Sequence, residues 1–162
     1  MTMTSWKSNF MRALMLAAAA LMMVTPPAGG QEMTPPPEFL VTQRSAYDFD
    51  ETLSRIRRAI EAENLMVVHE INPQQMLRMV GVRTGGMRQV LFFHPRYMKQ
   101  IMETNRNAGI EPPLKVLVME SPNGVMVRYE DPVHQFQVYR GLGALSEELR
   151  GIFERVVAAV AK

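Results

Sequence analysis

The side chains best suited to chemistry in this chain gather around His94, which stands between an apolar run and a proline. Imidazole changes charge near neutral pH and also ligates metals, so His94 could serve as an acid, a base or a ligand. Arg96 and Tyr97 follow closely and could add a cation and a phenol to the same site. We therefore take His94, Tyr97 and Arg96 as the candidate residues for binding a ligand or cofactor.

Metal binding would need further ligands, and the other two histidines are His69 and His134. No His-x-His or His-x-x-x-His spacing is present, so the histidines would have to converge through the fold. A homodimer offers another route, because two copies of His94 across a two-fold axis could hold haem or copper without any cysteine. Haem or copper bound through His94 is one prediction. A protein without a cofactor, in which His94 only caps a helix, is the alternative.

Cysteine is absent from the chain, which excludes disulfides, thiolate metal sites, haem attached through a cysteine pair and cysteine catalysis. The sequence also contains no Walker loop, dinucleotide fingerprint, nucleophile motif or zinc-protease helix. These observations favour a non-catalytic binding protein for a small ligand, metal or haem-type cofactor. They leave open a small enzyme that uses His94 as acid or base, and a purely structural dimerisation module.

Methionine is frequent, with 15 residues, of which six fall in the first thirty positions. The other nine are spread along the chain without a Met-x-Met cluster. Flexible thioether side chains commonly fill gaps in hydrophobic cores, and we expect most of these residues to do so. Capture of copper(I) by thioethers is the alternative, because soft sulfur ligands select this ion.

The first thirty residues are typical of a secretory signal peptide. Lys7 and Arg12 precede an apolar run over 13–24, which is shorter than the roughly 20 residues needed to cross a bilayer. Small residues at 28–30 suit a cleavage site. We therefore predict a signal peptide over 1–30, no stable membrane anchor after cleavage, and a periplasmic or secreted protein.

Removal of this segment would also change the charge balance, because it carries two basic residues and no acidic one. The remainder holds sixteen basic and sixteen acidic residues. A nucleic-acid-binding protein needs a basic surface to contact phosphates. Since no basic arm or run stands out in the sequence, we exclude nucleic acid as a partner.

The elements that must position His94 are predicted from apolar periodicity and from helix caps. Asp48 or Asp50 should cap the first helix, and Asn64 should end it in the left-handed conformation. Residues 31–44 form a proline-rich linker with a short first strand at 39–44. Residues 45–162 form a single domain. Its predicted elements are, in order, helix 48–64, strand 65–71, helix 73–81, strand 89–93, helix 95–105, strands 114–120 and 125–130, and a closing helix from Ser146.

Local patterns specify how these elements pair. Asn123-Gly124 between two β-rich runs predicts a hairpin. Strict alternation in the strand 65–71 places His69 on the same side as Leu65, and the nearly continuous apolar run 89–93 is typical of a central strand covered on both faces. A loop is expected from 133 to 143. The fold class is therefore α+β, with a mixed β-sheet of about five strands and helices packed on it in the order βαβαβαββα.

Three segments, Pro113–Val118, Val127–Pro132 and Phe49–Leu53, resemble the core of the family catalogued as domain of unknown function 302. The resemblance covers roughly 45–162. It implies a small α+β domain that is often a homodimer and has no established general activity. At one position the chain departs from the family, because a small polar residue, often Asn, usually precedes the proline where His94 stands here.

Overall fold

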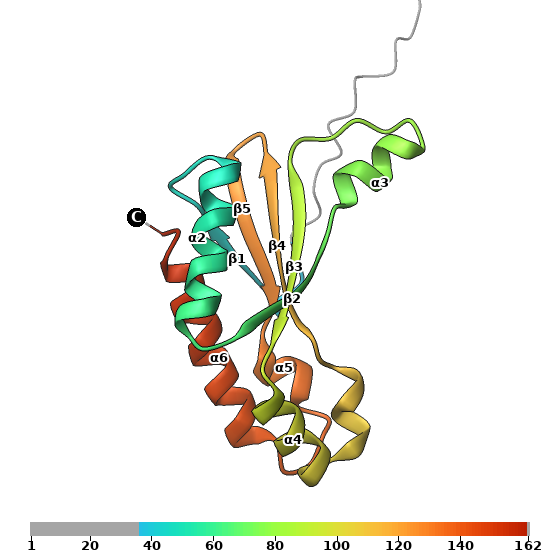
Figure 1. Cartoon of the computed structure of the whole chain (residues 1–162), viewed down its shortest axis with the longest axis vertical. Helices are drawn as coiled ribbons and strands as arrows, with labels where there is room; N and C mark the ends of the chain where they lie inside the picture. The colour runs from blue at the N-terminus through green and yellow to red at the C-terminus, as the bar shows by residue number, and fades with distance from the viewer. Residues whose placement is uncertain (1–35, 162) are drawn as a thin grey trace, which may run out of the picture. The chain divides into compact units, whose positions relative to one another are not determined.

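The computed structural model describes residues 36–161, and the predicted signal peptide lies outside this range. Five strands form one sheet in the order β1-β5-β4-β3-β2, and all four pairs of neighbours are antiparallel. Figure 1 shows α3 and α4 beyond opposite ends of the sheet, so β3 begins at the end of the sheet where β2 finishes, and β4 begins at the end where β3 finishes. The strands are β1 (Leu40–Arg44), β2 (Met66–Ile71), β3 (Met87–Phe93), β4 (Leu114–Ser121) and β5 (Gly124–Glu130).

The α+β class and the predicted order of elements are confirmed, and the sheet is antiparallel throughout where a mixed sheet was expected. Among the described residues, no helix is long and apolar enough to span a bilayer. The helices are α2 (Phe49–Ala62), α3 (Pro73–Met79), α4 (Pro95–Thr104), the 3₁₀ helix η1 (Arg106–Ile110), α5 (Pro132–Phe136) and α6 (Gly143–Ala158).

The predicted caps of the first helix are present. The Asp48 carboxylate accepts a hydrogen bond from the Glu51 backbone N–H at 2.9 Å, which satisfies one of the free donors at the start of α2. Asn64, just past the end of α2, has a φ of 57° and so adopts the left-handed conformation expected of a helix stop. Short side chain-to-backbone contacts therefore define α2 as the sequence indicates.

Two predictions near the C-terminus were wrong. A loop was expected after Asp131, but Asp131 accepts from the Val133 N–H at 2.9 Å and Pro132 occupies the first helical position, so α5 forms there. Helix α6 begins at Gly143, and Ser146 lies inside it with its hydroxyl donating to the Gly143 carbonyl oxygen at 2.8 Å. Burial of Leu142 and Leu145 anchors this extra first turn.

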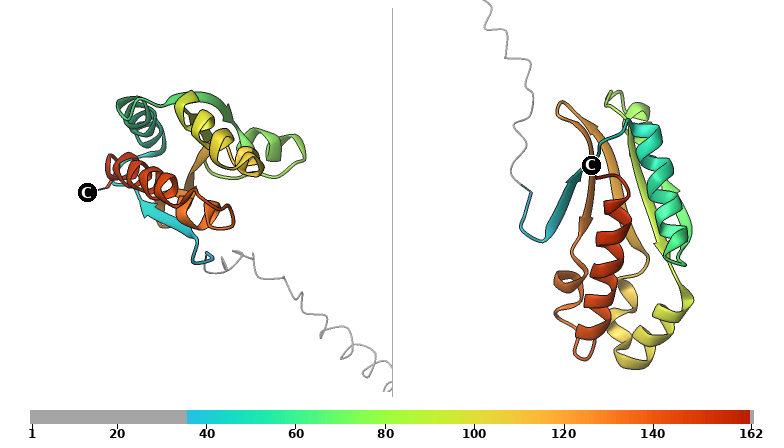
Figure 2. Two further views of the ribbon diagram at one scale, coloured as in Figure 1. Left: turned by 90° about the horizontal axis from the view of Figure 1, so that it is seen from below. Right: turned by 90° about the vertical axis from the view of Figure 1, so that its left-hand side faces the viewer.

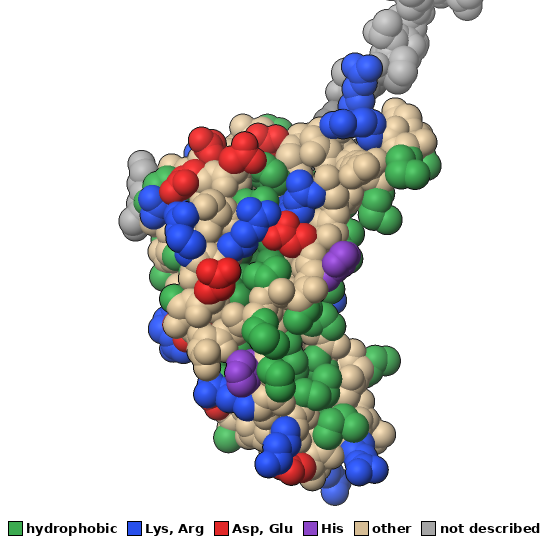
Figure 3. Space-filling model, in the orientation of Figure 1, with side chains coloured by type: hydrophobic (Ala, Val, Ile, Leu, Met, Phe, Trp, Pro, Cys, Tyr) green, Lys and Arg blue, Asp and Glu red, His purple; other side chains and the backbone are tan. Residues whose placement is uncertain are grey.

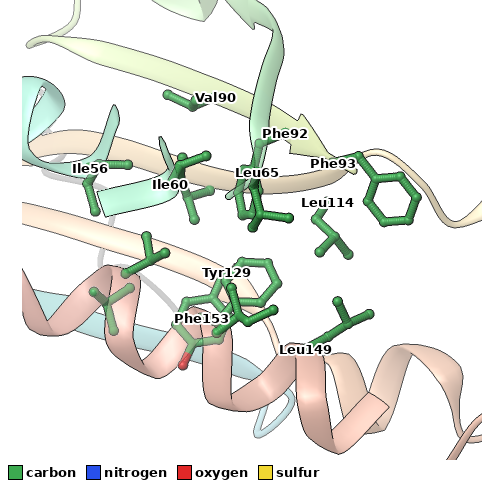
Figure 4. Close-up of a cluster of buried hydrophobic side chains, with 14 of the residues drawn as sticks. Ile56, Ile60, Leu65, Val90, Phe92, Phe93, Leu114, Tyr129, Leu149 and Phe153 are labelled. Carbon is green, nitrogen blue, oxygen red and sulfur yellow. The ribbon is translucent and has the colours of Figure 1, made fainter. Parts of the chain in front are cut away.

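Helices α2 and α6 lie side by side over one face of the sheet (Figure 2), which we call the covered face. The Phe153 ring of α6 stacks on Tyr129 of β5 with 4.6 Å between ring centroids, and it meets the Phe92 ring of β3 at 5.3 Å. Figure 4 shows these side chains together with Leu149 and Leu114 between helix and sheet. This cluster is the hydrophobic core of the domain.

The opposite face, which we call the open face, carries the alternate residues of the same strands. Val90 and Phe92 of β3 are fully buried, whereas Leu91 between them is only half-buried. The expectation that β3 is covered on both faces was therefore wrong. Its apolar run extends across the open face, where neither α2 nor α6 lies.

A β-bulge in β2 changes which side chains share a face. Val67 pairs with Phe92 and His69 pairs with Leu91, so Val68 is an extra residue in the edge strand. His69 therefore lies on the open face, and the predicted strict alternation with Leu65 was wrong. On the covered face, Glu70 accepts two hydrogen bonds from the Arg57 guanidinium of α2, at 2.6 and 2.7 Å.

Methionine is missing from the core of the described chain. The buried hydrophobic residues are Leu, Ile, Val, Phe, Tyr and Ala, and every described methionine is half-buried or exposed. The expectation that methionines fill the core was therefore wrong. Stiff β-branched and aromatic side chains suit the fixed space under two helices better than a flexible thioether does.

Candidate functional site

His94 stands at the junction of β3 and α4 and caps the helix. Its backbone is extended, Pro95 takes the first helical position, and Nδ1 accepts a hydrogen bond from the Arg96 N–H at 3.1 Å. Because this bond uses the Nδ1 lone pair, a neutral His94 carries its proton on Nε2. The ring therefore presents an N–H donor in this conformation.

A groove of about 490 Å³ lies beside His94, and we call it the His94 groove. Edge strand β2 forms one side with half-exposed Met66 and Val68, and α4 forms the other. Figure 3 shows hydrophobic side chains gathered where the sheet meets α4. Among residues 36–161, the groove is lined by Met66, Val68, Phe93, His94, Pro95, Met98 and Lys99.

Tyr97 and Arg96 do not line this groove. Tyr97 is buried, and its hydroxyl donates to the Glu148 carboxylate of α6 at 2.7 Å. Arg96 lies over the Tyr97 ring, with its guanidinium carbon 4.5 Å from the ring centroid. Burial raises the pKa of Tyr97, and the Glu148 carboxylate raises this pKa further. Tyr97 therefore stays protonated and joins α4 to α6, although its ring also meets the edge of His94 at 6.5 Å.

The other two histidines lie elsewhere. His69 is exposed on the open face of β2, and His134 of α5 stacks on Phe39 with 4.6 Å between ring centroids. Within residues 36–161, no group of three or more histidine, aspartate or glutamate side chains is arranged to hold a metal ion. The fold does not bring the three candidate histidines into one such group.

Sequence reasoning missed most of the groove. Met98 stands four residues after His94, a spacing that places both on one side of a helix end, and this signal was available. Met66 and Val68 could not be found in this way. They reach the groove only because β2 pairs with β3 as an edge strand.

The family model described as Domain of unknown function DUF302 matches residues 41–162. The chain belongs to this family. No curated protein matches the sequence.

A crystal structure of an uncharacterized conserved DUF302 protein from Bacillus stearothermophilus is similar to this chain, with a TM-score of 0.72. It shares 14% sequence identity, and the match covers 76% of this chain and 99% of the other. At this identity the similarity shows the DUF302 fold and leaves ligand and activity undetermined.

Proposed function

We propose that this DUF302 protein is a secreted or periplasmic, non-catalytic binding protein whose His94 groove holds a small amphipathic anion. The observation that carries this proposal is the lining of the groove, which combines apolar side chains with one imidazole and one ammonium group. Ligand sites commonly pair apolar walls with a few polar groups that fix orientation.

Each part of the lining has a role toward such a ligand. Met66, Val68 and Phe93 would cover an apolar body, and burial of that surface favours binding by about 25 cal/mol per Å². The Nε2–H of His94 would donate to an oxygen of the ligand. Lys99 would attract the negative charge, since its only ion pair among the described residues is an exposed contact of 3.8 Å with Glu103.

The same lining argues against catalysis by His94. A histidine that acts as a base is normally oriented by a carboxylate or another partner. The nearby Glu148 carboxylate instead bonds Tyr97, away from the groove. None of the described residues that line the groove carries a carboxylate or a hydroxyl group.

Copper or haem iron is the second candidate ligand, and the observation that favours it is the presence of Met66 and Met98 in the same lining as His94. Imidazole and thioether sulfur together suit copper(I) and the axial positions of haem. Ligation through Nε2 would require the proton to move to Nδ1, which would break the cap bond to Arg96. The amphipathic anion needs no such change.

The test uses 8-anilinonaphthalene-1-sulfonate, a fluorescent aromatic anion, with decanoate as a competitor. We expect the protein to bind the dye and decanoate to displace it. His94→Asp keeps a capping carboxylate but replaces the donor with a negative charge, so it should weaken binding by about tenfold or more. Tyr97→Phe is the matched control and should bind as the wild type does. Absence of binding, or equal binding by His94→Asp, would overturn the proposal.

We also propose that the protein forms a homodimer through the open face. Half-buried Leu91 and Leu117 lie there, and the Arg128 Nε is withdrawn from solvent without a hydrogen-bond partner among the described residues. Glu130 stands two residues further along the same face, so a two-fold axis between them could pair Arg128 with Glu130 of the second copy. Sedimentation equilibrium should give a dimer that Leu117→Asp converts to a monomer, and a monomeric wild type would contradict this.

A further inference from the structure

Three methionines form a continuous row across the open face. Met87 of β3 pairs directly with Met119 of β4, and Met119 pairs directly with Met126 of β5. Partners in an antiparallel pair share one face, with Cβ atoms about 4.5–5.5 Å apart. Residues far apart in the sequence therefore form one thioether cluster, which we call the methionine row.

Packing does not account for the row. Val118 of β4 and Val127 of β5 form the neighbouring pair on the covered face, and both are fully buried under the helices. The three methionines are half-buried on a face that α2 and α6 leave open. In a single chain their sulfur atoms can therefore be reached from outside the domain and are partly shielded from water. In the proposed homodimer the row would lie beside Leu117 and Arg128 at the interface.

We propose that the methionine row binds one copper(I) ion through three thioether sulfurs. Thioethers are soft ligands, and they select copper(I) over magnesium, calcium or manganese, which prefer oxygen. Neighbouring strands lie about 4.8 Å apart, and a methionine side chain has three rotatable bonds, so the outer two sulfurs can lean toward the central one. Met119 is the central ligand because it pairs with both of the others.

The surroundings of the row agree with this choice of ion. Arg44 lies opposite Met126 on β1, and Arg128 follows two residues later on the same face of β5. A guanidinium is not a metal ligand, and the two positive charges repel a divalent ion more strongly than monovalent copper(I). Thioethers also bind without losing a proton, so copper(I) affinity at the row should be independent of pH, unlike that of a histidine site.

The row is separate from the His94 groove. Met87 is the first residue of β3 and His94 follows its last, so the two sites lie at opposite ends of this strand. The proposal therefore does not depend on the function proposed for the groove. Met102 of α4 is an exposed methionine outside both the row and the lining of the groove, so it provides a control of the same chemistry.

The experiment titrates the purified protein with copper(I) under anaerobic conditions against a chromophoric copper(I) chelator. We expect one ion per chain, the same affinity at pH 5 and pH 7.5, and an X-ray absorption spectrum with sulfur neighbours only. Met119→Leu conserves volume and should keep the fold, while it weakens copper(I) binding by about tenfold or more. Met102→Leu is the matched control and should bind copper(I) as the wild type does.

Three results would overturn the proposal. The first is failure of the wild type to compete for copper(I). The second is equal affinity of Met119→Leu and wild type. The third is loss of affinity in Met98→Leu or at pH 5, with nitrogen in the absorption spectrum, because this would place the ion in the His94 groove. Thermal unfolding of each variant without copper separates a folding defect from a loss of ligand.

Discussion

The covered and open faces of the sheet are built by the same strands and differ in the kind of side chain they carry. Val116, Val118 and Val127 project under the helices, whereas Leu117, Met119 and Met126 project from alternate positions on the other side. The covered face is close-packed against α2 and α6, so its side chains must have a fixed shape. The open face keeps flexible thioethers and charged side chains, which makes it the face available for partners or ions.

The largest expected effect tests whether stability comes from the covered face. Phe153→Ala removes the ring that stacks on Tyr129 and should destabilise the domain by about 3–5 kcal/mol. Leu117→Ala on the open face should cost clearly less when unfolding is measured at a protein concentration where the proposed homodimer dissociates, because this side chain is only half-buried in a single chain. Urea unfolding of both variants measures the difference, and equal losses would show that the open face is also packed against a partner.

A smaller loss of stability is expected when the His94 cap between β3 and α4 is removed. His94→Ala removes the acceptor for the Arg96 N–H and should cost about 0.5–2 kcal/mol, as for other capping residues. His94→Asp should recover most of this stability, because aspartate is a good cap. If His94→Asp were as unstable as His94→Ala, the histidine would stabilise the protein through something other than the cap.

Tyr97→Phe tests whether Tyr97 stabilises the contact between α4 and α6 or takes part in binding at the His94 groove. Loss of the hydroxyl removes the hydrogen bond to Glu148 and should reduce the free energy of unfolding by about 0.5–1.5 kcal/mol. Binding in the His94 groove should not change, because Tyr97 is not part of its lining. Weaker dye binding with unchanged stability would instead assign Tyr97 to the groove.

The smallest effect concerns charge at the edge of the covered face. Hydrogen bonds from Arg57 lower the pKa of Glu70, and Arg88 lowers it further. A lowered folded-state pKa gives stability that is present above the ordinary glutamate pKa of about 4.3 and is lost as the pH falls through the folded value. The pair is partly exposed, so we expect at most about 1 kcal/mol.

Between pH 7 and pH 3, the free energy of unfolding should therefore fall less steeply for Glu70→Gln than for the wild type. Lys115→Gln on the open face is the control and should leave the slope unchanged, because Lys115 has no ion pair among the described residues. An identical slope for Glu70→Gln would mean that the Arg57 pair does not persist in solution.

Much of the fold could be predicted because its signals are local. The Asn123-Gly124 turn, the Asp48 cap and the proline at position 95 each act within a few residues, and the elements they define are where the sequence places them. The short helix α5 was missed, although its cap and proline, Asp131 and Pro132, were visible in the sequence.

The candidate site could be predicted only in part. His94 was found because a histidine before a proline is conspicuous, and it does line a groove. Arg96 and Tyr97 are close to His94 in the sequence, but their side chains point toward α6 and not into the groove. Residues along a helix point in different directions, so closeness in the sequence does not place them in one site. The bulge at Val68, which brings His69 to the open face, has no clear signal in the strand itself.

The amino-acid sequence by itself determined the α+β class, the order of elements and the helix start at His94, because caps, turns and periodicity depend on neighbouring residues. The tertiary structure alone decided that one face of the sheet stays open and that Met87, Met119 and Met126 stand side by side. Strand register joins residues separated by long stretches of chain, and no local pattern encodes which pairs will meet.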